Sequence, residues 1–520
     1  MATHKTEAAL NRRQLPSRPL LEEFSLLFYI GKIWGINAQD FQEFRNHKHL
    51  EKSLGGNCLV IVITVCVFIC FNLMVWVFHD PEYSVEKDIF TVALALILTY
   101  FSLAVYLTDR YTHLRTQDQL MEIFDTLHDL DDDLMELGIE VDNSPIRYRI
   151  LLQIVFASIC ESLVFLFTFA FLVSHDSWTS GLWIFTAVPT YCNALDKIWY
   201  NTIVLAIKKR FEIINAEFDN MALEMQHQAS KKIISMPVFS VEKESNRKIH
   251  PRKMKVQPSM IPSYNQKGIL NDSRNKPKKE FLGPKSNIDL NMPSSGTGPI
   301  FNEMLENRFE KICQLHNELC VMGVELNGIW SVPILALMAY GFLMVTAQLY
   351  FFYCATVNQI IPSLFRPANS LVITIIFLLY VSVKCFSILM LSWLTNLESK
   401  KSGVCIHRCA TAADNGRIYE MVNHLSLKLF NHAVDFNASG YFSLDMDTLF
   451  GFLGGISTYL IILIQFNIEQ QQVRSAAASG GLATANNDES IAKTIAENAT
   501  ELFTQMFATT DDISASQQFQ

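Results

Sequence analysis

The chain has 520 residues, of which 50% are hydrophobic and only 18% are charged, and its formal net charge is −9. This composition is too apolar for an ordinary soluble protein of this length and indicates a polytopic membrane protein. The 11 cysteines do not form the pattern of a disulfide scaffold, because the segments expected outside the cell contain no pair of them.

Residues 1–57 are mostly polar, and no cleavable signal peptide is recognisable before the first long apolar stretch. One apolar patch in this region, Phe24–Ile36, is too short to cross about 30 Å of hydrocarbon. We therefore expect this patch either to pack against a helical bundle or to lie at the membrane interface.

Seven apolar stretches have the length of about 20 residues that a membrane-spanning helix requires. They are Cys58–Phe78, Ile89–Leu107, Ile150–Val173, Leu182–Ile207, Val332–Thr356, Leu371–Leu394 and Met446–Phe466. The fold class predicted from them is an all-α membrane protein with seven transmembrane helices.

The distribution of Lys and Arg predicts the orientation of these helices. With a cytoplasmic N-terminus, the inner segments hold 36 of the 42 basic residues and the outer segments hold 4. The bias remains 22 to 4 when the longest inner loop is left out. The positive-inside rule thus predicts a cytoplasmic N-terminus and an extracellular C-terminus, opposite to a G-protein-coupled receptor.

Three segments outside the apolar stretches carry amphipathic helical stripes and therefore need partner helices. We expect them to form a compact cytoplasmic bundle, with the acidic run Asp131–Asp133 on its solvated face. The stripes are Leu127, Leu130, Leu134 and Leu137; Phe211, Ile214, Phe218, Met221 and Met225; and Leu305, Phe309, Ile312, Leu315, Leu319 and Met322.

Two further segments lack such patterns. Residues 229–300 contain 8 of the 16 prolines and 14 basic residues against 5 acidic ones, which predicts a disordered basic cytoplasmic loop. Residues 467–520 are rich in Ala, Gln, Ser, Asn and Thr, include the glycosylation sequon at Asn498, and are expected to form an extracellular tail.

The predicted organisation follows directly from these segments. Residues 1–57 form the cytoplasmic N-terminal region, 58–228 form transmembrane helices 1–4 with cytoplasmic extensions, and 229–300 form the disordered basic loop. Residues 301–445 form helices 5 and 6 with cytoplasmic anchor segments, 446–466 form helix 7, and 467–520 form the extracellular tail.

The last apolar stretch contains two polar residues, Thr458 and Gln465, which lie within roughly 20° of each other on a helix. A buried amide at membrane depth needs hydrogen-bond partners or a water-filled space. Two readings remain open: a hydrogen bond between helices, or a polar face that lines a pore and is repeated by symmetry. Gly451 and Gly455 have a small-xxx-small spacing that permits close helix packing, either inside one subunit or between subunits.

This stretch also resembles a known family. Thr458-Tyr459, five aliphatic residues and then Gln465-Phe466 resemble the C-terminal signature of insect gustatory receptors, and the lead-in Phe436–Asp445 resembles the segment that precedes it there. The resemblance covers residues 20–466 without the long insertion. It implies a homotetramer or heterotetramer with related receptors, a cytoplasmic anchor bundle and a central pore lined by the seventh helix.

The same resemblance implies a tastant-gated nonselective cation channel in the lipid bilayer of the plasma membrane, in dendrites of chemosensory neurons. The pore and gate residues it implies are Thr458, Ile461, Ile462, Gln465 and Phe466. No ring of acidic residues is expected on this helix, so strong selectivity for divalent cations is not expected.

Polar residues in the other spans divide into two expected groups. A charge at the centre of a bilayer is costly, so Glu161, Asp196, Lys197 and Lys384 are expected to pair with one another or to face water. Aromatic and hydrogen-bonding residues in the outer halves are candidates for binding a tastant, although some also suit an interfacial belt. These candidates are Trp183, Thr186, Thr190, Tyr191, Gln348 and Tyr353.

The ligand implied by the resemblance is a sugar such as fructose, with a bitter compound as the second expectation. Leu460 follows Thr458-Tyr459 at the position where the branch that senses several sugars usually carries Glu, which weakens a generic sugar assignment. A seven-helix receptor signalling through G protein and a membrane transporter are the rival classes.

No enzyme motif, catalytic residue, cofactor site or nucleic-acid partner is predicted. The sequence contains no Gly-rich phosphate loop, zinc-helix motif or nucleophile elbow. Cys405-x-His407-x-Cys409 has no fourth ligand nearby, so no metal site is expected there either.

Overall fold

The computed structural model describes residues 20–40, 51–78, 89–172, 184–235, 298–357, 371–412, 416–431 and 434–479. Within these ranges the elements are helices apart from the two-residue strands β1 (Gln39–Asp40) and β2 (Glu51–Lys52), which pair antiparallel. The helices are α2 (Leu20–Ile33), α4 (Leu54–Phe78), α6 (Ile89–Arg115), α7 (Gln117–Glu136), α8 (Ser144–Leu172), α9 (Ile184–Ser235), α10 (Gly298–Thr356), α11 (Leu371–Ala412), α12 (Gly416–Asn431) and α13 (Met446–Ser479).

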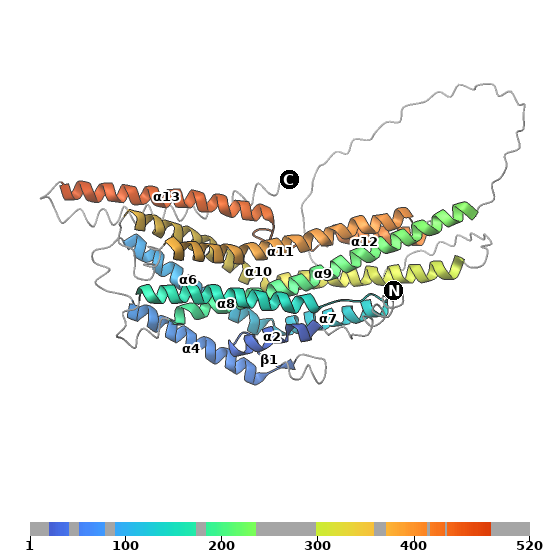
Figure 1. The fold of residues 1–520 in the computed structure, drawn as a ribbon, viewed down its shortest axis with the longest axis horizontal. Coiled ribbons are helices and arrows are strands. Elements are labelled where there is room, and N and C mark those ends of the chain that lie inside the picture. Colours follow the sequence, from blue (N-terminus) through green and yellow to red (C-terminus); the bar gives the residue numbers. More distant parts are fainter. Residues whose placement is uncertain are drawn as a thin grey trace, which may run out of the picture.

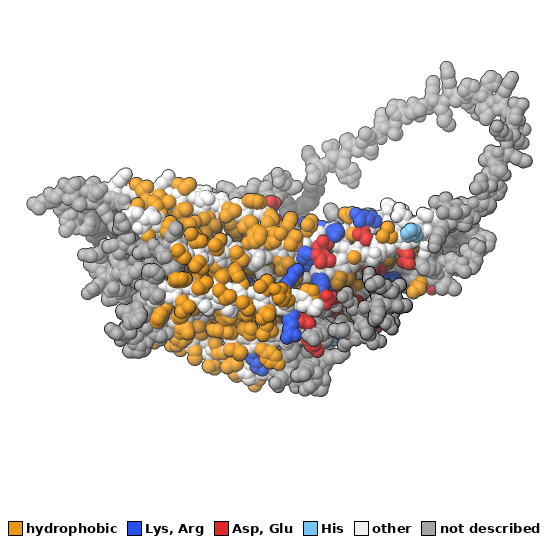
Figure 2. Space-filling model, in the orientation of Figure 1, with side chains coloured by type: hydrophobic (Ala, Val, Ile, Leu, Met, Phe, Trp, Pro, Cys, Tyr) orange, Lys and Arg blue, Asp and Glu red, His pale blue; other side chains and the backbone are white. Residues whose placement is uncertain are grey.

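The long helices run roughly along one axis of the molecule (Figure 1). Along this axis the molecule has two halves that differ in their surface side chains. Apolar side chains cover one half of the visible surface, whereas Lys, Arg, Asp and Glu gather on the other half (Figure 2). Helices α9, α10 and α11 extend through both halves, and α13 lies along the edge of the apolar half (Figure 1). This division is what a bilayer-embedded bundle with a water-exposed extension requires.

Five described helices are long and apolar enough to cross a membrane: α4, α8, α10, α11 and α13. The other two predicted spans, Ile89–Leu107 and Leu182–Ile207, coincide with α6 and the first half of α9. In α9, residues 192–204 are all buried, and this stretch includes the charged pair Asp196 and Lys197. That α6 and α9 also cross the membrane stays a prediction.

The charged half is a helical bundle, as the three amphipathic stripes predicted. Leu127 and Leu134 of α7, Phe211 of α9, and Phe309 and Ile312 of α10 are each fully buried in one apolar cluster. The solvated position expected for Asp131 was wrong, because its carboxylate is buried and accepts hydrogen bonds from the Arg210 guanidinium at 3.0 and 2.6 Å. The prediction placed this acid on the surface because burying a lone charge is costly, and the buried Arg210 partner offsets that cost.

The short N-terminal helix α2 packs against the bundle, which decides between the two positions expected for its apolar patch. The Phe24 ring meets the Phe124 ring edge-on at 5.2 Å, and the Phe28 ring meets Trp199 edge-on at 4.7 Å between centroids.

The start of α4 passes close to the backbone at Ala38, and this explains the glycine at position 56. A Cβ atom at Gly56 would lie 2.1 Å from the Ala38 carbonyl oxygen.

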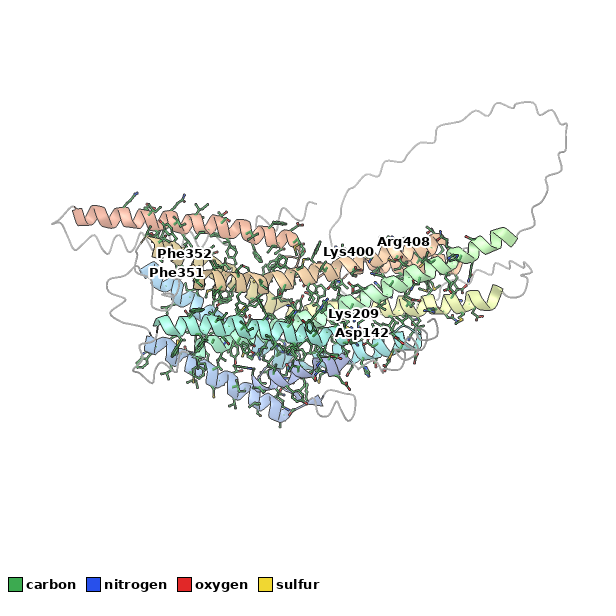
Figure 3. The ribbon with its side chains drawn as sticks, viewed as in Figure 1. Asp142, Lys209, Phe351, Phe352, Lys400 and Arg408 are labelled. Atoms are coloured by element: carbon green, nitrogen blue, oxygen red, sulfur yellow. The ribbon has the colours of Figure 1, made fainter. Side chains whose placement is uncertain are left out.

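Side chains fill the bundle along its length, from Phe351 and Phe352 in the apolar half to Lys400 and Arg408 in the charged half (Figure 3). Where the two halves meet, α8 begins beside Asp142, whose carboxylate accepts hydrogen bonds from the Ser144 N–H and hydroxyl at 3.0 and 2.6 Å. These donors lower the pKa of Asp142 below its ordinary value.

Several sequence-based expectations fall outside the described residues. Trp183, residues 236–297 of the expected basic loop, and residues 480–520 with the sequon at Asn498 belong to this group.

Candidate functional site

The apolar half contains a buried cluster of charged and amide side chains at the contact between α6 and α9. The Lys197 ammonium donates to Asp109 at 2.9 Å and to Asp196 at 2.6 Å, and all three side chains are at most 2% exposed. The His113 ring pairs with the other oxygen of Asp196. Each carboxylate therefore has a cationic partner, which is the condition for keeping charges inside such a bundle.

The cluster continues from α9 to α11 through Asn193. Its amide nitrogen donates to Asp109 at 2.7 Å, and its amide oxygen accepts a hydrogen bond from the Lys384 ammonium at 3.1 Å. On α8, Glu161 accepts hydrogen bonds from the Tyr380 hydroxyl at 2.8 Å and the Thr190 hydroxyl at 3.1 Å. Four helices are thus joined by polar contacts inside the apolar half.

The sequence predicted that the four intramembrane charges would pair with one another or face water. Asp196 and Lys197 do pair. Glu161 and Lys384, in contrast, are hydrogen-bonded to neutral Tyr, Thr and Asn side chains.

The sequence-based prediction missed Asp109 and His113, because both follow Leu107, the predicted end of the second span. Their spacing of four residues puts them on one face of α6, and that i,i+4 pattern just beyond a span was the available signal.

The predicted tastant-binding residues separate into two groups. The Tyr191 hydroxyl lies 2.9 Å from the Ser158 hydroxyl, its ring meets Trp34 at 4.8 Å, and its neighbour Thr190 reaches Glu161. On α10, the amide nitrogen of Gln348 donates to the Thr374 hydroxyl at 3.4 Å, and Tyr353 packs on an apolar cluster.

Among the residues that the structure describes, no hydrogen bond or ring contact joins these two groups. Thr186 lies on α9, one turn before Thr190, but its side chain is not described, and Trp183 precedes the described part of α9. Which of these residues touch a ligand stays a prediction.

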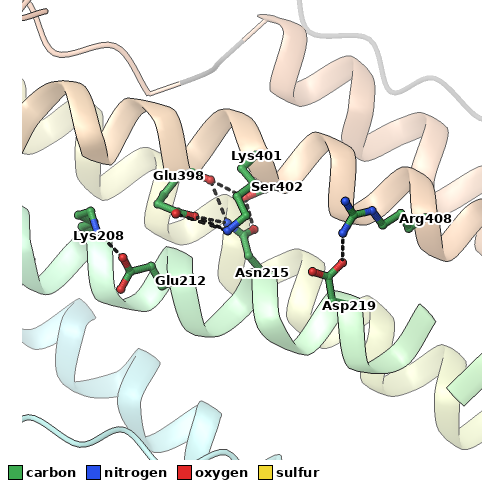
Figure 4. A network of polar contacts seen from close by, with 8 residues as sticks. All are labelled: Lys208, Glu212, Asn215, Asp219, Glu398, Lys401, Ser402 and Arg408. Atoms are coloured by element: carbon green, nitrogen blue, oxygen red, sulfur yellow. Dashed lines mark hydrogen bonds and ion pairs between the residues drawn. The ribbon is translucent and has the colours of Figure 1, made fainter. Parts of the chain in front are cut away.

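In the charged half, α9 and α11 are held together by a second polar network (Figure 4). The Asn215 amide nitrogen donates to the Glu398 carbonyl oxygen at 2.9 Å, and the Ser402 hydroxyl donates to the Asn215 amide oxygen at 2.6 Å. Further along, Arg408 donates to Asp219 at 2.9 Å (Figure 4). The α9–α11 pair is therefore joined by polar contacts in both halves.

Helix α13 is attached to the bundle along one face only, mainly through α10. The Tyr459 ring meets Phe342 edge-on at 5.7 Å, Leu460 and Leu463 pack on the α10 cluster, and the Asn467 amide donates to the Tyr350 hydroxyl at 3.1 Å. A Cβ atom at Gly455 would lie 2.9 Å from the Phe342 ring, so this glycine permits the close approach of α13 to α10.

The opposite face of α13 is exposed and carries the polar residues of the last span. Positions alternate by three and four residues, which places them in one stripe on the helix. The stripe consists of Gly451, Gly454, Thr458, Ile461, Gln465 and Ile468. Of the five predicted pore residues, Thr458, Ile461 and Gln465 lie on it, whereas Ile462 and Phe466 are half-buried beside it.

The segment before α13 fixes where this helix begins. The Asn437 N–H donates to the Asn327 side chain of α10 at 3.0 Å, and the Gly440 N–H donates to the Asn437 side chain at 2.9 Å. Gly440 has a φ of +78°, a conformation that glycine adopts without strain. Asp445 then accepts a hydrogen bond from the Thr448 N–H at 2.9 Å and caps the first turn.

Comparison with known proteins matches this fold and its C-terminal helix to one family. The profile of the 7tm Chemosensory receptor family matches residues 24–255 and 287–470. The chain is 38% identical over 491 residues to a Drosophila melanogaster protein named "Gustatory receptor for bitter taste 66a", covering 88% of this chain and 91% of that relative. It is 26% identical over 166 residues to "Gustatory receptor 68a" of the same species, covering 31% of this chain and 40% of that relative.

Among solved structures, the fold is similar to the insect olfactory receptor OR5 from Machilis hrabei in complex with eugenol. The two have a TM-score of 0.53 at 10% sequence identity, and the match covers 86% of this chain and 99% of that chain. These findings define a multi-helix chemosensory membrane receptor. The chain belongs to the insect gustatory receptor family, as its Thr-Tyr…Gln-Phe segment indicated.

One expectation about the ligand is not supported by these comparisons. The relative that matches most of this chain is named for bitter taste, so the comparisons favour the second expected ligand class and give no support to fructose.

Proposed function

We propose that this receptor is a ligand-gated nonselective cation channel whose pore is lined by α13 from four subunits. The observation that carries the proposal is the exposed stripe of α13. Thr458 and Gln465 point away from the bundle of their own protomer. If this face of α13 met hydrocarbon, the Gln465 amide would lack the hydrogen-bond partners it needs. When four copies of α13 face one central axis, these polar groups line a water-filled pore. The four Ile461 side chains then form an apolar ring that can close the pore by dewetting.

The proposed topology has seven spans, with the N-terminus in the cytosol and the C-terminus outside. The bias of Lys and Arg supports this orientation, as does the gathering of charged side chains at one end of the bundle (Figure 2). In this arrangement α6 and α9 are the second and fourth spans, and their buried charges are tolerated because they pair inside the protomer.

Helix α10 connects the candidate ligand residues to the pore helix. Gln348 bonds to Thr374 of α11, and two residues later Tyr350 bonds to Asn467 of α13. Residues two apart point about 200° from each other on a helix, so these contacts lie on opposite sides of α10. A ligand that moves α10 relative to α11 therefore moves α13, and it opens the channel only if it binds the open state more tightly.

The ligand class that we propose is a bitter compound at the plasma membrane of a chemosensory neuron. Its support is the 38% identity to a relative named for bitter taste, together with Leu460 at the position discussed for sugar sensing. The test expresses this chain alone in a cell line and applies salicin and quinine in parallel with fructose and sucrose.

Currents evoked by a bitter compound, and insensitive to blockade of G-protein signalling, are the expected result. Responses to sugars alone would overturn the ligand class. An N-terminal epitope that antibodies reach without permeabilisation would reverse the topology and favour a G-protein-coupled receptor. Substrate uptake without current would favour a transporter.

A further inference from the structure

The exposed stripe of α13 does not end with the predicted span at Phe466. The helix continues to Ser479, and Glu469 follows Gln465 by four residues. Residues four apart lie within about 40° on a helix and about 6 Å apart along its axis. The expectation that this helix carries no ring of acidic residues covered Met446–Phe466 only, and Glu469 lies on the part of the helix beyond that range.

Near Glu469, a buried contact with α10 fixes the rotation of α13 about its own axis. Asn467 is 4% exposed and donates to the Tyr350 hydroxyl of α10. Glu469 stands two residues later, about 200° around the helix, so it must point away from α10. It is exposed, and no ion pair joins it to any residue in the described ranges.

We infer that Glu469 supplies a ring of carboxylates at the outer mouth of the channel, which concentrates external cations and binds Ca²⁺ and Mg²⁺ there. The inference rests on the proposed function, since one subunit contributes one carboxylate. In the assembled pore the ring lies about 6 Å outside the ring of Gln465 amides. Carboxylate rings of this kind select cations over anions and take divalent cations from the external solution.

The position of Glu469 relative to the apolar stretch agrees with this role. The apolar stretch of α13 that is long enough to span the membrane is Met446–Glu469. Glu469 is its last residue, so the charge lies at the boundary between membrane and water rather than in hydrocarbon. The stripe between Gly451 and Glu469 holds only glycine, hydroxyl, aliphatic and amide groups, so Glu469 carries the only charge on this part of the exposed face.

The experiment titrates external Ca²⁺ while recording both unstimulated and salicin- or quinine-evoked currents from the full chain. Glu469→Gln is expected to raise the half-blocking Ca²⁺ concentration about tenfold, because a ring of like charge raises the local cation concentration by at least that factor. Glu469→Asp keeps the charge and should keep the block. The matched control is Asp447→Asn, which neutralises an exposed acid in the first turn of the same helix, 22 residues away, and should leave external block unchanged.

A Glu469→Cys variant separates charge from folding, because its charge is changed on channels already at the surface. An external methanethiosulfonate reagent with a negative group should restore block during the recording, and a positive one should not, whereas the wild type should respond to neither. Unchanged block in Glu469→Gln, or a restoring effect of both reagents, overturns the inference.

The two proposals fail in different ways. If the wild type conducts and Gln465→Ala alters its conductance while every Glu469 variant behaves as wild type, the carboxylate ring is wrong and the channel stands. If wild-type receptor at the cell surface gives no current under any condition, the proposed function fails, and the ring fails with it.

Discussion

Helices α9 and α13 both carry polar residues in apolar stretches, but they use them in opposite ways. In α9, Asp196 and Lys197 are fully buried and bond to α6, so their polarity holds one protomer together. In α13, none of the residues in the most apolar stretch is buried, and Thr458 and Gln465 face away from the bundle. A polar residue in a membrane helix therefore either bonds within its own protomer or, as we propose for α13, faces water and other copies of the chain, and its burial in the protomer distinguishes the two cases.

The largest effect on stability is expected from removing Lys197, the central cation of the α9 cluster. Lys197→Met leaves Asp109 and Asp196 without their shared ammonium, and truncating one partner of a buried pair costs about 3–5 kcal/mol. Folded receptor should be nearly lost in fluorescence-detected size-exclusion chromatography of tagged protein. Lys208→Met on the same helix is the control, because Lys208 pairs with Glu212 one turn along that helix and such i,i+4 pairs are worth about 0.3–0.5 kcal/mol. Equal losses for both variants would contradict the distinction.

The same contrast holds in the charged half with a smaller effect. Arg210→Met leaves Asp131 buried, but the Asn143 amide still donates to that carboxylate at 3.2 Å, so we expect a loss of about 3 kcal/mol, the low end for such pairs. Arg408→Met breaks a pair with Asp219 in which the side chains are 60% and 37% exposed, and it should cost about 0–1 kcal/mol. Thermal melting of detergent-solubilised receptor measures both, and a larger shift for Arg408→Met would refute this ranking.

On α13 itself, substitutions on the two faces should differ in stability. Gly455→Ala places a methyl group against the Phe342 ring, which must shift, at a cost of about 1 kcal/mol. At Gly451 a Cβ atom meets nothing within 4 Å in the protomer, so Gly451→Ala should stay within about 0.5 kcal/mol of wild type. The melting temperatures of the two solubilised variants make the comparison, and a greater loss at Gly451 would show that this face is already covered within one protomer.

The smallest effect on stability is expected at the centre of the exposed stripe. Gln465→Ala should leave surface expression and melting unchanged within about 0.5 kcal/mol, because Gln465 is exposed in the protomer. Single-channel conductance should nevertheless change, since four amides leave the proposed pore together. Ser457→Ala, about 80° around the helix from Gln465, is the control and should conduct like wild type. Wild-type conductance in Gln465→Ala would mean that this amide does not line the pore.

The sequence by itself determined the membrane class, the family signature around Thr458 and Gln465, and the helical extensions. These features follow from local pattern: apolar length, and stripes repeating every three to four residues, which continue along α9 and α10 beyond the apolar stretches. It also required partners for Asp196 and Lys197, because the cost of a charge in hydrocarbon does not depend on knowing the fold.

Only the tertiary structure decided which partners those charges have and which way each polar face points. Asp109 and His113 reach Asp196 and Lys197 across more than 80 residues of sequence, and no local pattern encodes such a contact. Asp131 is buried because the Arg210 guanidinium of α9 is hydrogen-bonded to it. Glu469 points away from α10 because Asn467 is bonded to Tyr350 of that helix. The period of a helix tells which residues share a face, but the neighbour that occupies that face is fixed only when the helices pack.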